Sequence, residues 1–103
     1  MIRVDKIVAI EPYYVICLLN NGVSKKIDIE QLIKEHSKLN GIIKLKDINY
    51  LKSAQIGNFG EIYWSDTIKI KNTLWNYDIS PEFIYHHGLD FNSLNLGFSL
   101  KKN

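Results

Sequence analysis

Alternation of apolar and polar residues predicts a first strand over residues 2–11. Its apolar positions share one face at period two: Ile2, Val4, Val8 and Ile10. Pro12 ends or kinks this strand. Residues 13–20 are apolar at consecutive positions instead, which predicts a central strand covered on both faces.

The clearest turn signal in the chain is Asn20-Asn21-Gly22. Asn and Gly tolerate the positive φ that a two-residue hairpin turn requires. A third strand is therefore predicted over residues 23–29. Its apolar face consists of Val23, Ile27 and Ile29. Lys25 interrupts this face near the turn, where we expect its ammonium group to reach water.

A helix is predicted to begin at Asp28, whose carboxylate can accept hydrogen bonds from the first-turn N–H groups. Gln31 follows at the capping-box position. The apolar face of this helix is Ile29, Leu32, Ile33 and His36. Asn40-Gly41 closes the unit, and a second short helix is predicted to begin at Asp47.

The middle of the chain predicts a series of strands. Two of them, over residues 53–58 and 61–64, flank a tight turn or bulge at Phe59-Gly60. Ile68 and Ile70 then alternate with lysines, which predicts one side of a half-exposed hairpin over residues 66–72. Residues 73–79 are extended and rich in aromatic side chains.

Ser80-Pro81-Glu82 predicts the start of the last helix, because Ser caps, Pro suits the first helical position and Glu favours the positive helix end. Gly88 ends this helix. We expect residues 1–88 to form a single α+β domain: a small mixed, mainly antiparallel sheet with two or three short helices.

Residues 89–103 are predicted to form a strand-like tail. Its large apolar residues alternate at period two: Leu94, Leu96, Phe98 and Leu100. The tail adds a strand to its own sheet or pairs with an edge in a second subunit. The second arrangement is favoured by a small margin, because Gly88 frees the chain to leave the last helix.

Composition adds constraints on the class of protein. A chain of 103 residues with 46% hydrophobic content fits one domain with one core. Its net charge of +2 lacks the basic excess that is typical of nucleic-acid binders. Cys17 is the single cysteine and lies in the apolar strand, so we expect a buried, unreactive thiol. A charged N-terminus with no long apolar run predicts a cytoplasmic protein without a signal peptide or membrane helix.

Candidate chemistry is sparse, and we expect neither an enzyme nor a bound metal or cofactor. His86 and His87 are adjacent on a helix and point about 100° apart, so they do not converge on one metal ion. His36 joins them only if tertiary packing brings it there. The carboxylates have no spacing that forces two together: Asp28, Glu30, Asp47, Asp66 and Asp78. Gly57-Asn58-Phe59-Gly60 lacks the Lys and the following helix of a phosphate loop.

Two lysine clusters are the remaining candidate site. Lys44, Lys46 and Lys52 form the first cluster, and Lys69 and Lys71 form the second. The second has aromatic neighbours in the sequence, namely Tyr63, Trp64 and Trp75. Aromatic rings interleaved with lysines can stack on single-stranded nucleic acid. The alternative is an exposed strand face over core aromatics.

The order of these signals resembles the bacterial family catalogued as domain of unknown function 2442. The matching segments are residues 4–10, 14–18, 21–22, 27–29, 45–47, 60–64 and 78–85. Either Trp64 or Trp75 matches the family tryptophan, because residues 65–77 form a longer insert here. The resemblance implies an α+β fold that starts with an antiparallel hairpin and implies no activity. It further implies association with helix-turn-helix segments or with a second small domain, as in a toxin–antitoxin-like pair.

The recurrent residues of that family have structural explanations in this chain: Gly22 in a turn, Asp28 and Ser80 as caps, Pro81 in a first helical turn, and Trp64 in the core. The sequence therefore favours a non-enzymatic interaction module with a small protein partner, or one that self-associates. The exposed candidates for the contact are Trp75, Tyr77, Phe91, Leu96 and Phe98. The alternative is a nucleic-acid-associated regulator that acts through the lysine clusters.

Overall fold

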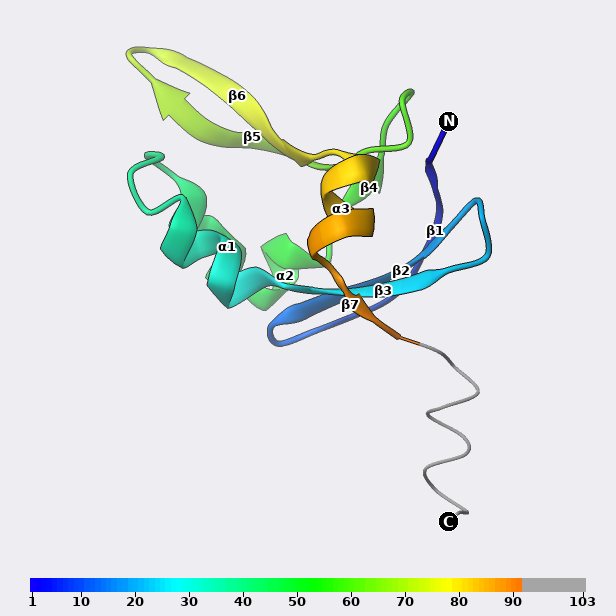
Figure 1. Cartoon of the computed structure of the whole chain (residues 1–103). Helices are drawn as coiled ribbons and strands as arrows, with labels where there is room; N and C mark the ends of the chain where they lie inside the picture. The colour runs from blue at the N-terminus through cyan, green and yellow to red at the C-terminus, as the bar shows by residue number, and fades with distance from the viewer. Residues whose placement is uncertain (92–103) are drawn as a thin grey trace.

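The computed structural model describes residues 1–91 and has an α+β fold, as predicted. Its elements in chain order are β1 (Val4–Glu11), β2 (Tyr14–Leu19), β3 (Ser24–Asp28), α1 (Ile29–Glu35), the 3-10 helix η1 (Ile42–Lys46), α2 (Ile48–Leu51), β4 (Gln55–Ile56), β5 (Ile62–Ile70), β6 (Thr73–Ile79), α3 (Pro81–His87) and β7 (Leu89–Asp90). The strands form two antiparallel sheets rather than one, in the orders β1-β2-β3-β7 and β4-β5-β6. The helices lie between these sheets (Figure 1).

The four-stranded sheet is built around β2, which pairs with β1 on one side and β3 on the other. Val15, Ile16 and Cys17 are all buried, so the prediction of a central strand covered on both faces is confirmed. The predicted Asn-Gly turn joins β2 to β3. Gly22 has φ +86° there, and the N–H of Leu19 donates to the carbonyl of Val23 at 2.8 Å.

The single apolar face predicted for β1 is wrong in detail. Two register shifts, between Val4 and Lys6 and between Ile7 and Ala9, interrupt the pairing with β2. Bulges of this kind add a residue to one strand and reverse the faces beyond it. As a result Val8 is exposed, whereas Ile7 packs against the core.

The expectation that Lys25 reaches water is also wrong, because β7 covers it. Only 7% of the residue is exposed. Its Nζ lies 2.6 Å from the Asp90 carboxylate and 3.5 Å from the Gly88 carbonyl, and 5.3 Å from the centre of the Tyr85 ring. The chain after α3 thus returns to the edge of β3 and supplies the partner for this charge.

Each of the three helices begins at a capping side chain that was predicted. The carboxylate of Asp28 accepts from Gln31 N at 3.0 Å, that of Asp47 accepts from Asn49 N at 2.9 Å, and the hydroxyl of Ser80 accepts from Phe83 N at 3.1 Å. The capping-box contact of the Gln31 side chain is not made, because its amide donates to Glu35 one turn further on. α3 ends before Gly88, as predicted.

Two features of the middle region differ from the predicted elements. No pattern in the sequence predicted η1, which covers the core with Ile42 and Leu45. The strands predicted over residues 61–64 and 66–72 are one continuous strand, β5. The predicted strand over residues 53–58 shortens to the two residues of β4.

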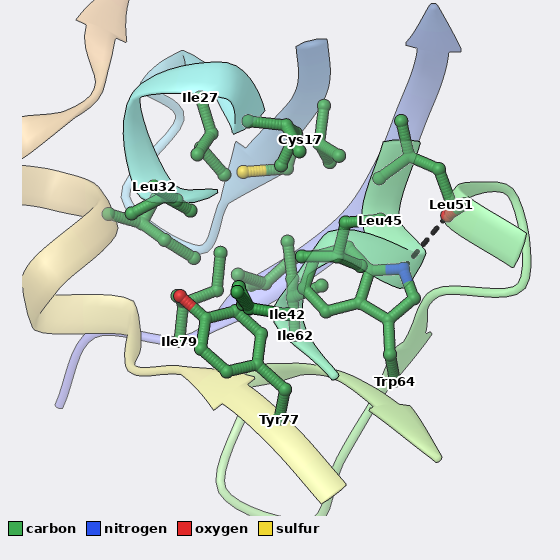
Figure 2. Packing of buried hydrophobic residues seen from close by; sticks show 14 of the residues in the cluster. Cys17, Ile27, Leu32, Ile42, Leu45, Leu51, Ile62, Trp64, Tyr77 and Ile79 are labelled. Atoms are coloured by element: carbon green, nitrogen blue, oxygen red, sulfur yellow. Dashed lines mark hydrogen bonds between the residues drawn. The ribbon is translucent and has the colours of Figure 1, made fainter. Parts of the chain in front are cut away.

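The core joins both sheets and all three helices (Figure 2). Trp64 is fully buried, as predicted, and its indole N–H donates to the carbonyl of Leu51 at 2.9 Å. Tyr77, which we expected to be exposed, is buried at 6% exposure beside Trp64, with ring centres 6.0 Å apart. Its hydroxyl lies 2.8 Å from Nδ1 of His36, the residue that follows α1. Tyr77 therefore belongs to the core and is withdrawn as a contact residue.

The first residues of the predicted tail pair within the chain. Lys25 and Lys26 of β3 face Asp90 and Leu89 of β7, and the N–H of Phe91 donates to the carbonyl of Ser24 at 2.9 Å. The other tail candidates, Leu96 and Phe98, lie outside the described residues. No helix within residues 1–91 has the length and apolar character needed to cross a membrane.

Candidate functional site

The hairpin of β5 and β6 lies on the opposite side of the molecule from β1, β2 and β3, and its tip lies over the turn that follows α1 (Figure 1). A bulge divides it. Trp64 faces Tyr77 and Ile68 faces Trp75, so the three residues between Trp64 and Ile68 oppose Asn76 alone. We call the part beyond this division, residues 65–76, the arm. Because the insertion adds two residues, it does not reverse the faces of the strand.

The core-side face of the sheet therefore continues onto the arm. Trp64 and Tyr77 lie on this face in the core, and the next pair, Ile68 and Trp75, continues it. Trp75 is 55% exposed and Ile70, two residues beyond Ile68, is 53% exposed. Leu74 is exposed on the opposite face. The arm thus presents large apolar side chains to solvent on both of its faces.

The bulge is fixed by side chains from neighbouring elements. Asp66 has φ +53°, and its N–H donates to the Asn76 side-chain oxygen at 3.2 Å. The buried hydroxyl of Thr67 donates to the carbonyl of Trp64 at 3.0 Å. Tyr50 on α2 donates to the carbonyl of Ser65. These contacts hold the base of the arm in one geometry.

A backbone contact from the segment after α1 also supports the arm. The N–H of Lys69 donates to the carbonyl of Asn40 at 2.8 Å. Gly41 has φ +110°, and a Cβ there would collide with the carbonyl of Thr67. Lys44 donates to the carbonyl of Asp66 at 3.0 Å. Glycine at position 41 is therefore required both by its φ and by this close approach.

Charge is distributed unevenly along this hairpin. Lys69 and Lys71 lie near the tip of the arm, whereas Asp78 lies at its base. Asp78 lines two adjoining hollows of about 250 and 240 Å³, which share Glu61 and the exposed Phe59, and Glu82 lines the second. The tip is thus basic and the base acidic.

The glycine-bearing segment 57–60 forms the predicted tight turn. Gly60 has φ +76° and its N–H donates to the carbonyl of Gly57 at 3.0 Å. Glu61 accepts the N–H of Phe59 at 2.9 Å. A strand follows the turn, as predicted, so the segment has no helix to complete a phosphate loop.

The histidines make separate ring contacts. His36 bonds to Tyr77, His87 stacks on Phe83 with ring centres 4.6 Å apart, and His86 packs on the edge of Tyr85. Within residues 1–91, no three His, Cys, Asp or Glu side chains are grouped closely enough to hold a metal ion.

The carboxylates considered as an acid–base pair are dispersed. Asp28 and Asp47 cap different helices, and Glu30 pairs with Lys46 at 2.6 Å. Asp66 lies within the bulge of β5, whereas Asp78 lies on β6 opposite Tyr63. Lys46, a member of the first lysine cluster, is therefore already paired with an acidic side chain. Lys44, another member, is bonded to the arm as described above.

Two buried groups have raised pKa values. Burial raises the pKa of the Cys17 thiol to about 11, which opposes formation of a reactive thiolate. Burial, with smaller contributions from the charges of Asp78 and Glu35, raises the pKa of Tyr77 to about 12. Both groups are therefore neutral components of the core at physiological pH.

A shallow groove of about 140 Å³ lies between α1 and α3. Leu32 and Phe83 contribute apolar surface, and Glu35 and His87 contribute polar surface. The Glu35 carboxylate already accepts from Gln31 at 2.8 Å, and the His87 ring is stacked on Phe83. The polar groups of this groove are thus engaged locally rather than directed at a common point.

The arm is the surface that sequence reasoning identified only in part. The alternation around Ile68 and Ile70 predicted a half-exposed hairpin, and Trp75 was a named candidate. Leu74 was missed, because nothing in the sequence shows where the core ends beneath β6. Comparisons with models of known protein families, with curated proteins and with solved structures found no match.

Proposed function

We propose that this protein is a non-enzymatic interaction module that binds a small protein partner through the arm. One observation carries the proposal: the core-side face of the three-stranded sheet continues beyond the core and ends in the exposed side chains of Trp75 and Ile70. Each large apolar side chain left in water forgoes roughly 1.5–3 kcal/mol of burial. Clustered apolar exposure of this kind marks interaction sites.

The contacts at the base of the arm support a binding role. A surface that is held in place before binding loses less conformational entropy when a partner docks. Tyr50, Asn40 and Lys44 all contact the backbone of residues 65–69. The sequence resemblance to domain of unknown function 2442 agrees with a partner that is a second small protein, as one half of a toxin–antitoxin-like pair.

Affinity purification from the organism that encodes the chain tests this proposal. Tagged wild type is compared with Trp75→Ser and with Phe59→Ser, which removes an even more exposed aromatic ring outside the arm. We expect a co-purifying protein with wild type and Phe59→Ser that is lost with Trp75→Ser. A partner that binds Trp75→Ser as well as wild type would contradict a role for the arm.

A second candidate function rests on the lysines of the arm. Lys69 faces Leu74 and Lys71 follows two residues later, so two positive charges lie on the same short arm as the exposed Trp75, on its opposite face. This combination is suited to stacking and phosphate contact on single-stranded nucleic acid. It is the weaker candidate, because Lys46 of the other cluster is paired with Glu30 and the net charge is only +2.

A further inference from the structure

Four strands form the outer edges of the two sheets, and they differ in how they are protected. β4 and β7 have two residues each. β1 is long, but it is interrupted by two bulges and carries charged residues at both ends. Natural proteins use short length, bulges and charges to prevent edge strands from pairing with other chains.

β6 is the least protected of the four edges. It is seven residues long, and its sequence from Thr73 to Ile79 contains no Lys, Arg or Pro and one charge, Asp78. The irregularity of the hairpin lies in β5, which leaves β6 regular. Among the edges in residues 1–91, β6 is therefore the one best suited to accept another strand.

The hydrogen-bonding direction along β6 follows from contacts on the far side of β5. The N–H of Lys69 donates to Asn40, away from β6, so Lys69 and Leu74 form a non-hydrogen-bonded pair. At the other end, Tyr63 and Asp78 face each other. The carbonyl of Glu61, two residues before Tyr63, points toward β4, where it accepts from Gly57 N at 2.8 Å. By the alternation of a strand, the N–H and C=O groups of Leu74, Asn76 and Asp78 face the open edge.

We propose that two copies of this chain pair through β6, antiparallel and centred on Asn76. The proposal rests on the arm being a protein-binding surface, and it names a second copy as the occupant. In this register Asn76 lies opposite the partner's Asn76, and Leu74 lies opposite the partner's Asp78. All three outward-facing residues of each copy are then hydrogen-bonded. A shift of two residues in either direction leaves one of them unpaired in each copy.

The same register also brings side chains together on the core-side face of the extended sheet. Trp75 lies directly opposite the partner's Tyr77 in a non-hydrogen-bonded pair, where Cα atoms approach to about 4.5 Å. Aromatic cross-strand pairs of this kind stabilise sheets. Because the ring of Tyr77 is buried in its own core, the pairing places the exposed ring of Trp75 at the rim of the partner's core.

Charge complementarity also favours an antiparallel pair. Lys69 and Lys71 lie toward the tip of each arm, and Asp78, Glu61 and Glu82 lie toward its base. Antiparallel pairing brings the basic tip of one copy to the acidic base of the other. Because the interface is two-fold symmetric, each favourable contact occurs twice.

Light scattering across a dilution series, which measures the mass of the purified 103-residue chain in solution, tests this proposal. We expect twice the 12.0 kDa of one chain for the wild type. Leu74→Asp places two carboxylates opposite each other at both ends of the paired strands and is expected to give a monomer. Leu74→Lys, its matched control, faces the partner's Asp78 with the opposite charge and is expected to remain dimeric.

The double variant Leu74→Asp with Asp78→Lys is expected to restore the dimer. The carboxylate at position 74 then faces the ammonium group at position 78 of the partner. Circular dichroism of every variant checks that the monomer is folded. A monomeric wild type at all concentrations, or a dimer that persists in Leu74→Asp, would overturn the proposed pairing. If the wild type is monomeric while Trp75→Ser still loses a host partner, the interaction function stands and only self-pairing fails.

Discussion

Asp28 connects β3 to α1 and takes part in both elements. It faces Tyr14 across the sheet, while its side chain accepts the N–H of Gln31 at 3.0 Å. The cap satisfies one of the N–H groups that the first turn of a helix leaves free. A short helix such as α1, with seven residues, depends on caps and packing because its intrinsic stability is low.

We therefore expect Asp28→Ala to lower the free energy of unfolding by about 1 kcal/mol. Urea denaturation followed by circular dichroism measures this difference. Lys34→Ala, on the exposed side of the same helix, is the control and should change the midpoint much less. An unchanged midpoint for Asp28→Ala would mean that the cap contributes nothing to stability.

The raised pKa of Tyr77 predicts how the free energy of unfolding depends on pH in the alkaline range. Its pKa is raised to about 12 in the folded chain, whereas an unfolded tyrosine titrates near about 10. Between these values the unfolded chain loses the proton and the folded chain keeps it. The free energy of unfolding therefore falls as pH rises through this window, by up to about 1.4 kcal/mol per pH unit.

We expect Tyr77→Phe to reduce this fall, since phenylalanine has no proton to lose. Cys17 contributes in the same direction from about pH 9, because its pKa rises from 9.0 to about 11 on folding. Denaturation curves at several pH values for wild type, Tyr77→Phe and the exposed Tyr85→Phe measure the slopes. Equal slopes for wild type and Tyr77→Phe above about pH 10 would contradict this assignment.

At the tip of the arm, a lysine occupies a turn position whose backbone conformation favours glycine. Lys71 has φ +55° in the two-residue connection between the facing residues Ile70 and Thr73. A side chain in this left-handed region costs roughly 1–2 kcal/mol, and glycine avoids that cost. Asn72 follows Lys71 in the same connection and is not among the residues with positive φ.

We expect Lys71→Gly to stabilise the chain by about 0.5–1 kcal/mol after the entropy cost of glycine in the unfolded state is subtracted. Asn72→Gly has the same entropy cost without the relief and should be neutral or destabilising. Thermal unfolding of both variants decides between these outcomes. A loss of stability in Lys71→Gly would show that the lysine side chain makes a compensating contact.

The short strand β7 supplies Asp90, which forms an ion pair with Lys25. This pair differs in its solvent exposure from the second ion pair, Lys46–Glu30. Lys25–Asp90 and Lys46–Glu30 both have N–O distances of 2.6 Å. Both carboxylates are exposed, with 87% for Asp90 and 60% for Glu30, but the Lys25 side chain is only 9% exposed, whereas that of Lys46 is 38% exposed. Removing one partner of a buried charge leaves the other charge without compensation.

Asp90→Ala is expected to destabilise the chain by about 1–3 kcal/mol, because it leaves the buried ammonium group of Lys25 unpaired. Glu30→Ala removes the carboxylate of the exposed pair and should have a clearly smaller effect. Chemical denaturation of both variants provides the comparison. Equal effects would mean that β7 does not bury Lys25 in solution.

For the whole molecule, the near balance of charge sets an expectation about nucleic acid. Phosphate contacts dominate protein–nucleic acid affinity and weaken steeply with salt. With a net charge of +2, the chain is expected to bind single-stranded oligonucleotides weakly and without sequence preference. Fluorescence anisotropy at physiological salt tests this, with Lys69→Gln combined with Lys71→Gln as the control. Sub-micromolar binding that these substitutions abolish would favour the regulator function.

Local signals in the sequence were enough for the elements that depend on local contacts. The Asn-Gly turn before β3, the caps at Asp28 and Ser80, and the buried strand β2 were all predicted and are present. The turn and the caps depend on interactions between residues close in sequence. The buried strand is recognised from the apolar character of the whole run. The fold class followed from these elements.

What the sequence could not determine depends on contacts between distant residues. The bulges in β1 expose Val8, β7 covers Lys25, and Tyr77 is buried between Trp64 and His36. The candidate site was predictable only as far as Trp75 and the half-exposed hairpin. Tyr77 and Trp75 lie on the same face of one strand, two residues apart, and only tertiary structure decides that the core ends between them. The sequence by itself thus determined the caps, turns and strands, whereas packing decided which apolar residues remain available for a partner.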